Sequence, residues 1–210
     1  MNQPMNKLML LDQARRLWEE QLRAFGDGYI PVYGGGDANA AVVLVGEAPG
    51  EQETLQRKPF VGKAGQNLNG FLTVLGMGRE DIYITNVVKF RPVKVHPTRG
   101  SLSNRPPSRE EISLCAPLLR RELGIVAPKV VVTLGNVALR ALCTDPHVVI
   151  GDCHGSPRPM GDWELFALYH PASIIYNRSL ADTYQQDLLA LRDHLRLRGI
   201  LPAGTEGAQV

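Results

Sequence analysis

The sequence predicts an α/β fold, a three-layer α/β/α sandwich around a central, mostly parallel sheet of four strands. Three observations lead to this prediction. Short apolar runs occur four times along the 210-residue chain, as expected of parallel strands that are buried on both faces. Segments with apolar residues at helical spacing separate these runs. Polar segments rich in glycine, proline and asparagine stand where the runs end. Alternating strands and helices are typical of a parallel sheet with helices on both faces.

The expected elements follow in chain order. Residues 8–25 carry apolar side chains at helical spacing with charged residues between them, so an amphipathic helix is expected there. A turn-rich loop leads from this helix to the first strand, 41–45, which is apolar at every position. The next helix is expected to begin after Gly62 and to end near Gly76. The second strand is expected over residues 81–88.

The second half of the chain continues this alternation. A basic loop follows the second strand, and Ser108 with Glu111 then matches a capping box for a helix that runs to about Leu123. The remaining strands are expected over residues 128–135 and 164–170, and the remaining helices over residues 136–143 and 180–199. We expect one domain over residues 1–200 and a disordered tail over residues 201–210.

The overall charge says less than its distribution. The formal net charge is +2 and the pI about 8.5, which alone does not indicate a nucleic-acid partner. Basic residues gather between Arg79 and Arg121, where acidic residues are fewer. Such a segment could face a polyanion, and a solvated basic loop is the alternative interpretation.

Cysteine usage and the N-terminal residues bear on the compartment. The three cysteines, Cys115, Cys143 and Cys153, form no CxxC pair, and the N-terminal residues lack an export pattern. No apolar run approaches the length of a membrane span. We therefore expect a cytoplasmic protein that contacts no membrane and has no disulfide framework.

Four polar segments follow the four expected strands. They are GEAPG after the first, TNVVKFRP at the end of the second, LGNVA after the third and YHPAS after the fourth. Ligands of open parallel sheets bind beyond the carboxyl ends of the strands, so these segments should converge on one crevice.

The residue types in these segments suit a flat, polar, uncharged ligand that is attached to a phosphate backbone. The Asn86 amide can read the edge of a base, and Phe60 can stack on a planar ring. His170 can donate a hydrogen bond to a developing anion. Glu47 and Glu53 can position water or stabilise positive charge. The N–H groups at the start of the helix after Gly62 suit a phosphate, although each residue alone also fits a cap, a loop or the core.

Five segments together resemble the successive blocks of the uracil-DNA glycosylase superfamily, with family four as the nearest branch. They are VVLVGEAPGEQE…KPFVGKAG, ITNVVKFRP, NRPPSREEI, TLGNVAL and YHPASIIYN. The likeness runs from about residue 30 to about residue 195, in the family's order. It implies a monofunctional DNA repair glycosylase that flips uracil out of DNA and hydrolyses its N-glycosidic bond, leaving an abasic site. It also implies action on single- or double-stranded uracil-containing DNA, by chemistry that needs no metal or activated nucleophile. We expect a monomer without a cofactor, because a base-flipping enzyme needs only one face of the duplex.

The resemblance also assigns roles by position. Residues Gly46, Glu47 and Ala48 would line the uracil pocket, with Glu47 near the hydrolytic water or the sugar cation. The carboxylate of Glu53 would lie against the C5 side of the base. The Phe60 ring would stack on uracil, Asn86 would bond its O4 and N3 edge, and His170 would donate to O2. Contacts to DNA would come from Gly62, Lys63, Gly65, Lys89, Arg91, Ser173, Ile174 and Ile175, the isoleucines acting as a wedge.

The sequence departs from family four in its cysteines. The resemblance to family four implies four cysteines that hold an iron–sulfur cluster. Only Cys115 stands in a matching place in this sequence. The residue before "RP" in the second block is Phe90, where a cysteine would be expected. A cluster needs about four thiolates, so we expect no cluster, with Phe90 and its apolar neighbours filling the space. Cys143 and Cys153 could be proposed as replacement ligands, but they belong to other elements.

Four other functions remain open at this point. The long basic loop over residues 93–103 carries His96, and one branch of the superfamily uses a histidine in such a loop to trap the sugar covalently. A binding protein without turnover, or a glycosylase for another deaminated base such as hypoxanthine, would use the same fold. An unrelated nucleotide-phosphate binder could use the helix start at VGKAG. Tyr176 stands where the family often has arginine, which weakens one expected DNA contact.

Overall fold

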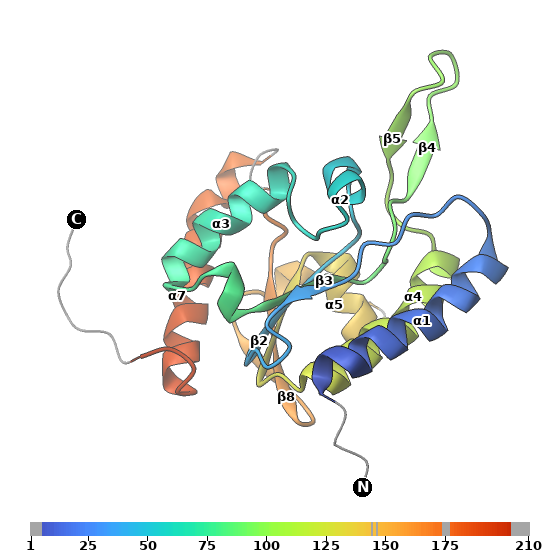
Figure 1. The fold of residues 1–210 in the computed structure, drawn as a ribbon. Coiled ribbons are helices and arrows are strands. Elements are labelled where there is room, and N and C mark those ends of the chain that lie inside the picture. Colours follow the sequence, from blue (N-terminus) through green and yellow to red (C-terminus); the bar gives the residue numbers. More distant parts are fainter. Residues whose placement is uncertain (1–5, 144, 146, 174–176, 203–210) are drawn as a thin grey trace, which may run out of the picture.

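A six-stranded sheet forms the centre of the protein, in the order β1-β3-β2-β6-β8-β7 (Figure 1). The computed structural model describes residues 6–143, 145, 147–173 and 177–202. The four inner strands run parallel to one another: β3 (Tyr83–Asn86), β2 (Val42–Gly46), β6 (Val130–Leu134) and β8 (Trp163–Leu168). These are the four strands that the sequence predicts, so the mostly parallel sheet is confirmed.

The prediction of only four strands is wrong, because two short strands pair antiparallel at the edges of the sheet. They are β1 (Gly35–Gly36) on β3 and β7 (Pro157–Met160) on β8. Glycine and proline weaken the sequence signal of a strand, and proline is confined to edge positions because it cannot donate to the ladder. The sequence pattern for these two strands was therefore that of a loop.

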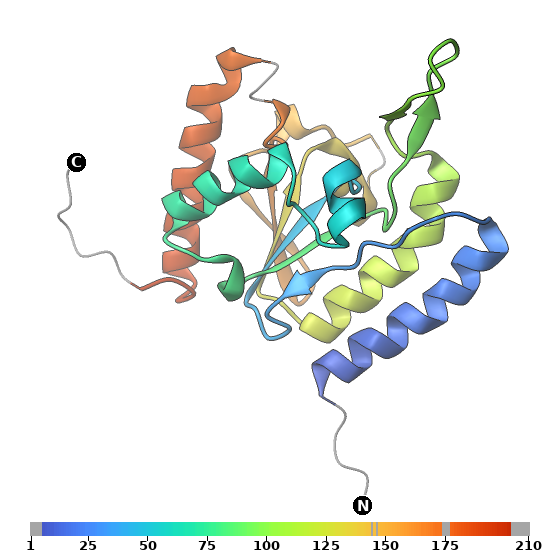
Figure 2. The same ribbon diagram turned by 45° about the horizontal axis from the view of Figure 1, so that its top comes forward.

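The first helical layer consists of α1 (Lys7–Phe25), α4 (Arg109–Val126) and α5 (Asn136–Leu142). Figure 1 and Figure 2 both show α1 lying along α4 on the same side of the sheet. The capping box predicted at Ser108 and Glu111 is confirmed, since each side chain accepts from the backbone N–H of the other residue. Val43 and Val45 of β2 pack into this layer.

The second helical layer covers the other face with α3 (Lys63–Leu75) and α7 (Ala181–Leu197). Val42 and Leu44 of β2 pack into this layer, so alternate residues of one strand serve the two faces. Both faces are apolar, which explains why the strand reads as a continuous hydrophobic run.

Shorter elements connect the strands and the long helices. They are the helix α2 (Glu51–Gln56), the hairpin β4 (Val93–Val95) with β5 (Leu102–Asn104), and the 3₁₀ turns η1 (Arg79–Asp81), η2 (Ile150–Asp152) and η3 (Arg178–Leu180). The hairpin projects well away from the body of the protein (Figure 1, Figure 2). It occupies the segment for which a basic loop was expected.

Some sequence-based expectations fall on residues that the structure does not describe. Ile174, Ile175 and Tyr176 are among them, as are residues 203–210 of the expected tail. Within the described part of the chain, every helix is too short or too polar to cross a bilayer.

Candidate functional site

A cavity of about 390 Å³ lies at the carboxyl edge of the sheet. Its walls come from α2, the Phe60 loop, the start of α3, the end of β3, the end of the hairpin and the segment after β8. It brings together seven of the predicted site residues: Ala48, Glu53, Phe60, Gly62, Lys63, Asn86 and His170. These residues are far apart in sequence, and the parallel sheet gathers them because its strands end at one edge.

A larger cavity of about 560 Å³ lies on the other side of the Phe60 loop. Its lining includes Arg79, Lys58 and the edge strand β1, but neither Asn86 nor His170. It is larger than the first cavity, but size does not decide which of the two is functional. The smaller one holds the polar groups that can recognise and activate a ligand, so we take the smaller one as the functional site.

Asn86 stands at the end of β3, next to Gly46 at the end of β2. A Cβ atom added at Gly46 would collide with Oδ1 of Asn86 and with the ring of Phe60. Gly46 therefore has a steric reason to be glycine: its backbone approaches both side chains closely. Asn86 is buried, with 3% of its surface exposed, and its side chain borders the cavity.

Phe60 is buried, and its backbone adopts the left-handed conformation, with φ of 54°. This conformation is uncommon for a residue other than glycine and needs support from its surroundings. Arg79 Nη2 supplies it by donating to the carbonyl oxygens of Phe60, at 2.5 Å, and of Gly65, at 3.2 Å. Sequence analysis missed Arg79, because nothing local to η1 indicates that its side chain reaches back to this loop.

His170 faces Phe60 across the site, with ring centroids 6.2 Å apart and the rings 29° from parallel. The backbone N–H of Ala172 lies 3.1 Å from Nδ1 of His170, which therefore acts as the acceptor. Burial lowers the pKa of His170, because a charged imidazolium is poorly solvated there. The ring is therefore neutral at pH 7 and carries its proton on Nε2, the tautomer that donates a hydrogen bond from that atom.

Glu47 directly follows β2, but its side chain is not part of the cavity lining. Partial burial raises the pKa of its carboxyl group. Its backbone carbonyl accepts from the N–H of Val88, which ties this residue to the segment after β3. The position fits a group at the rim of the site.

Glu53 borders the cavity and also holds the loop that forms part of its wall. Its buried carboxylate accepts from three backbone N–H groups, those of Gly50 at 3.1 Å, Val61 at 3.0 Å and Gly62 at 2.7 Å. Both oxygens are thereby engaged in holding the loop between α2 and α3. The predicted place of this carboxylate beside the base stays a prediction, and the three bonds add a structural role in holding the loop.

The predicted DNA contacts divide into exposed and buried residues. Lys63 is exposed at the cavity, and Arg91 is partly exposed and bonded to Glu51 and Asn104. The N–H of Gly62 is occupied by Glu53, and the hydroxyl of Ser173 donates to the carbonyl of His170.

Two of the predicted DNA contacts are corrected by burial. Gly65 is buried, and a Cβ there would collide with the carbonyl group of Phe60, so this glycine serves packing. Lys89 has no exposed surface, and its ammonium group pairs with Glu122 inside the protein. The prediction that Lys89 contacts DNA directly is therefore wrong.

The site of the family-four cluster does not suit a metal centre in this chain. Phe90 is 1% exposed, its ring centroid lies 4.3 Å from that of Tyr29, and it shares an apolar core with Cys115. Burial raises the pKa of the Cys115 thiol to about 11, which disfavours the thiolate that a cluster requires. Cys143 and Cys153 lie in a separate apolar cluster. The described residues contain no group of three or more metal-ligating side chains.

His96 is exposed on the β4–β5 hairpin and is not part of the cavity lining. Its backbone N–H donates to Ser101, and its Nδ1 lies 3.2 Å from the hydroxyl of Thr98. The hairpin tip thus folds around this histidine. Asn104 is the last residue of β5, at the end of the hairpin away from its tip. It borders the cavity, and the sequence did not predict this.

Known proteins resemble this chain in sequence. Residues 33–195 match the family described as "Uracil DNA glycosylase superfamily". A type-4 uracil-DNA glycosylase of Saccharolobus solfataricus is 30% identical over 200 residues, covering 91% of this chain and 88% of the relative. One from Archaeoglobus fulgidus is 37% identical over 166 residues, covering 76% and 78%.

The fold is also similar to that of a solved structure. A crystal structure of Pedobacter heparinus SMUG2 superposes with a TM-score of 0.52 at 12% identity, covering 77% of this chain and 76% of the other. At this identity the likeness concerns the fold alone. The family match covers most of the chain, and the two type-4 relatives match more than two thirds of it. The chain therefore belongs to the uracil DNA glycosylase superfamily and, within it, resembles the type-4 enzymes.

Proposed function

We propose that this protein is a monofunctional uracil-DNA glycosylase that flips uracil from DNA, hydrolyses its N-glycosidic bond and leaves an abasic site. The observation that carries this proposal is the convergence of Asn86, Phe60 and a neutral His170 on one cavity. The relatives named above support it, since they are uracil-DNA glycosylases by name.

The cavity suits one planar base rather than a whole duplex. A base inside a helix is out of reach, so the nucleotide must rotate out of the stack before it can enter. Phe60 would stack on the base, and the Asn86 amide would accept from uracil N3–H and donate to O4. Cytosine presents the opposite donor and acceptor pattern on this edge. An amide held in one orientation would therefore favour uracil.

Bond cleavage would use His170 and Glu47. As the glycosidic bond breaks, negative charge grows on uracil and positive charge on the sugar. The Nε2–H group of His170 would donate to uracil O2, where it stabilises the departing anion. The carboxylate of Glu47, together with DNA phosphates, would stabilise the sugar cation and orient the water that adds to C1′. These steps require neither a metal nor a covalent enzyme intermediate.

DNA would lie across the carboxyl edge of the sheet. Lys63 at the start of α3, Arg91, and the exposed Lys94 and Arg99 of the hairpin would contact phosphates. The N–H groups of the first turn of α3 beyond Gly62 add a favourable dipole for a phosphate. One such surface serves one duplex, so we propose that the protein acts as a monomer.

The test is glycosylase activity on labelled oligonucleotides that contain one uracil, either single-stranded, opposite G or opposite A. Products are separated on denaturing gels with and without alkali, for the wild type, His170→Ala and the exposed control His147→Ala. We expect an alkali-dependent break that His170→Ala strongly reduces and His147→Ala retains. An inactive wild type on all three substrates would overturn the proposal.

Two alternatives are resolved by the same gels. A slow band that survives denaturant and disappears in His96→Ala would indicate covalent trapping of the sugar by the hairpin. Cleavage only of an oligonucleotide that contains hypoxanthine would indicate that another deaminated base is the substrate.

A further inference from the structure

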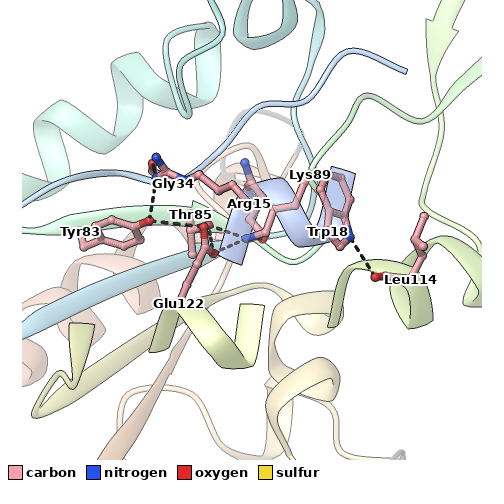
Figure 3. Close-up of polar contacts among 9 residues, drawn as sticks. Arg15, Trp18, Gly34, Tyr83, Thr85, Lys89, Leu114 and Glu122 are labelled. Carbon is pink, nitrogen blue, oxygen red and sulfur yellow. Dashed lines mark hydrogen bonds and ion pairs between the residues drawn. The ribbon is translucent and has the colours of Figure 1, made fainter. Parts of the chain in front are cut away.

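Lys89 carries a fully buried ammonium group directly behind the candidate base-reading residue. Its Nζ atom donates to Oε2 of Glu122 at 2.5 Å, to Oγ1 of Thr85 at 2.7 Å and to the backbone carbonyl of Asn86 at 2.7 Å. The side chains of Lys89 and Glu122 have no exposed surface. All three donors of the ammonium group are thereby satisfied (Figure 3).

Glu122 connects this group to the rest of the first helical layer. Its carboxylate also accepts from the hydroxyl groups of Thr85, at 2.9 Å, and Tyr83, at 3.3 Å. The Tyr83 oxygen in turn lies 3.4 Å from Nη2 of Arg15, which also donates to the carbonyl of Gly34 (Figure 3). The network thus runs from α1 through β3 to α4.

A contribution to folding stability does not by itself explain why this ion pair is buried. Two charges lose their hydration when they are buried, and apolar side chains of similar volume often serve stability equally well. A direct role in DNA binding is excluded for Lys89, because its side chain has no exposed surface. Buried pairs of this kind are retained in some proteins because they select one conformation.

The conformation selected here is that of the backbone around Asn86. The Gly46 and Asn86 pair is the last in the parallel ladder between β2 and β3. After it, the N–H groups of Val87 and Val88 donate to the carbonyls of Gly46 and Glu47. The Asn86 carbonyl accepts from Lys89 instead of from a strand. The segment is therefore held through its N–H groups on one side and through this ammonium group on the other.

We propose that Lys89 and Glu122 are positioning residues for base recognition: they fix the backbone that presents the Asn86 amide to the flipped base. This proposal rests on the proposed function, in which Asn86 reads the N3 and O4 edge. Without the ammonium group, the Asn86 peptide gains freedom to rotate, and its amide no longer meets the base in one orientation. The base-dependent rate falls, while the surface that contacts phosphates is unchanged.

The experiment is a mutant cycle between the buried pair and Asn86. The variants are Lys89→Met/Glu122→Met, which replaces the pair by apolar groups of similar length, Asn86→Ala, and the combination of both. Single-turnover rates are measured on single-stranded uracil DNA, together with the Kd for the same strand without uracil. We expect the methionine pair to lower the rate by about 10- to 100-fold with an unchanged Kd. In the Asn86→Ala background, it should cause no further loss.

The outcome that overturns the proposal is a methionine pair that keeps the wild-type rate, or one whose loss multiplies fully with that of Asn86→Ala. In either case uracil excision by the wild type still supports the proposed function. An inactive wild type would reject the proposed function itself. Should the methionine pair not fold, Lys89→Gln/Glu122→Gln retains a polar pair, but its shorter side chain leaves the Asn86 carbonyl without a donor. It is subject to the same two criteria.

A control separates positioning from general destabilisation. His194 and Glu164 form a partly buried pair at 2.9 Å near the start of β8, at the opposite edge of the sheet from the site. His194→Leu should lower the melting temperature without lowering the single-turnover rate at a temperature where the variant is folded. If His194→Leu lowered this rate as much as the methionine pair, the effect would be one of stability, and the positioning role would be rejected.

Discussion

The backbone N–H of Ala172 donates to Nδ1 of His170 at 3.1 Å, and this bond determines which imidazole nitrogen carries the proton. Burial lowers the pKa of His170 and keeps the ring, which faces that of Phe60, neutral. The histidine therefore acts as a hydrogen-bond donor through Nε2 and does not need to supply a full positive charge.

Replacing His170 should remove stabilisation of the departing anion. We expect His170→Ala to lower the single-turnover rate by about 100- to 1,000-fold, the range typical of a lost donor to a developing anion. Affinity for uracil-free DNA should be retained. Rate measurements beside His147→Ala, an exposed histidine outside the site, check this prediction. Equal losses in the two variants would contradict it.

The pH dependence follows from the directions of two pKa shifts. Burial lowers the pKa of His170, so the neutral ring persists through the usual titration range of histidine and is lost only at lower pH. Burial raises the pKa of Glu47, so its carboxylate is lost as pH falls through that raised value. The single-turnover rate should therefore be flat around pH 7 and fall on the acid side. If protonation of Glu47 causes the fall in rate at low pH, Glu47→Gln should remove that fall. The variant should also be slower than the wild type near pH 7.

Glu47→Gln should also change stability. The folded state raises the pKa of this carboxyl group, so it favours the protonated form and is destabilised at neutral pH relative to an uncharged side chain. The variant should therefore have a higher melting temperature than the wild type at pH 7. The gain should disappear at pH values below the pKa of the unfolded glutamate, where both proteins carry a neutral group. Melting curves at pH 7 and pH 3.5 would check the sign, and a gain that grew on acidification would refute it.

Gly46→Ala should disrupt the site, because the added methyl group meets Asn86 and Phe60. We expect a loss of about 1–3 kcal/mol in the free energy of unfolding, as for other insertions into a packed core, and strongly reduced uracil excision. Gly70→Ala in α3 is the matched control, since a Cβ there meets nothing within 4 Å. It should stabilise the helix by about 0.5–1 kcal/mol. Denaturant titrations of both variants provide the comparison.

Glu53→Ala should destabilise the loop between α2 and α3. The substitution leaves three backbone N–H groups without their acceptor, at a cost of about 1–3 kcal/mol for each group that water does not reach. Hydrogen exchange at Val61 and Gly62 should accelerate, and thermal unfolding should occur at lower temperature. The exposed neighbour Glu51→Ala is the control. Unchanged exchange at Val61 and Gly62 would mean that Glu53 does not hold the loop.

The hairpin should contribute affinity rather than chemistry. Lys94→Ala and Arg99→Ala each remove an exposed cation, so each should weaken DNA binding and reduce the slope of log K against log salt by about 1. Single-turnover rates at saturating protein should remain within about twofold. Lys129→Ala, an exposed cation at the opposite edge of the sheet, should change neither quantity. Retained affinity and slope in the hairpin variants would place DNA elsewhere.

The sequence by itself determined the four parallel strands, the principal helices and the edge at which the site lies. Continuous apolar runs such as 41–45 can be buried only between two helical layers, and parallel strands end at one edge, so Asn86 and His170 were expected together. The cap at Ser108 was also predicted, because a capping box is local in sequence.

Only the tertiary structure decided which charged residues are buried. Lys89 was expected to contact DNA, yet it is enclosed, since its partner Glu122 comes from a distant segment. The bonds from Glu53 to Val61 and Gly62 likewise depend on how the loop between α2 and α3 folds. The burial of Glu122 could have been predicted in part, because it shares a helical face with the buried Cys115, Leu119 and Val126. No local pattern indicates that its partner is Lys89. The role of Arg79 could not have been predicted, because its contact with Phe60 depends on how two loops pack. Periodicity encodes which face of an element is apolar, whereas the pairing of buried polar groups depends on distances that exist only in the folded chain.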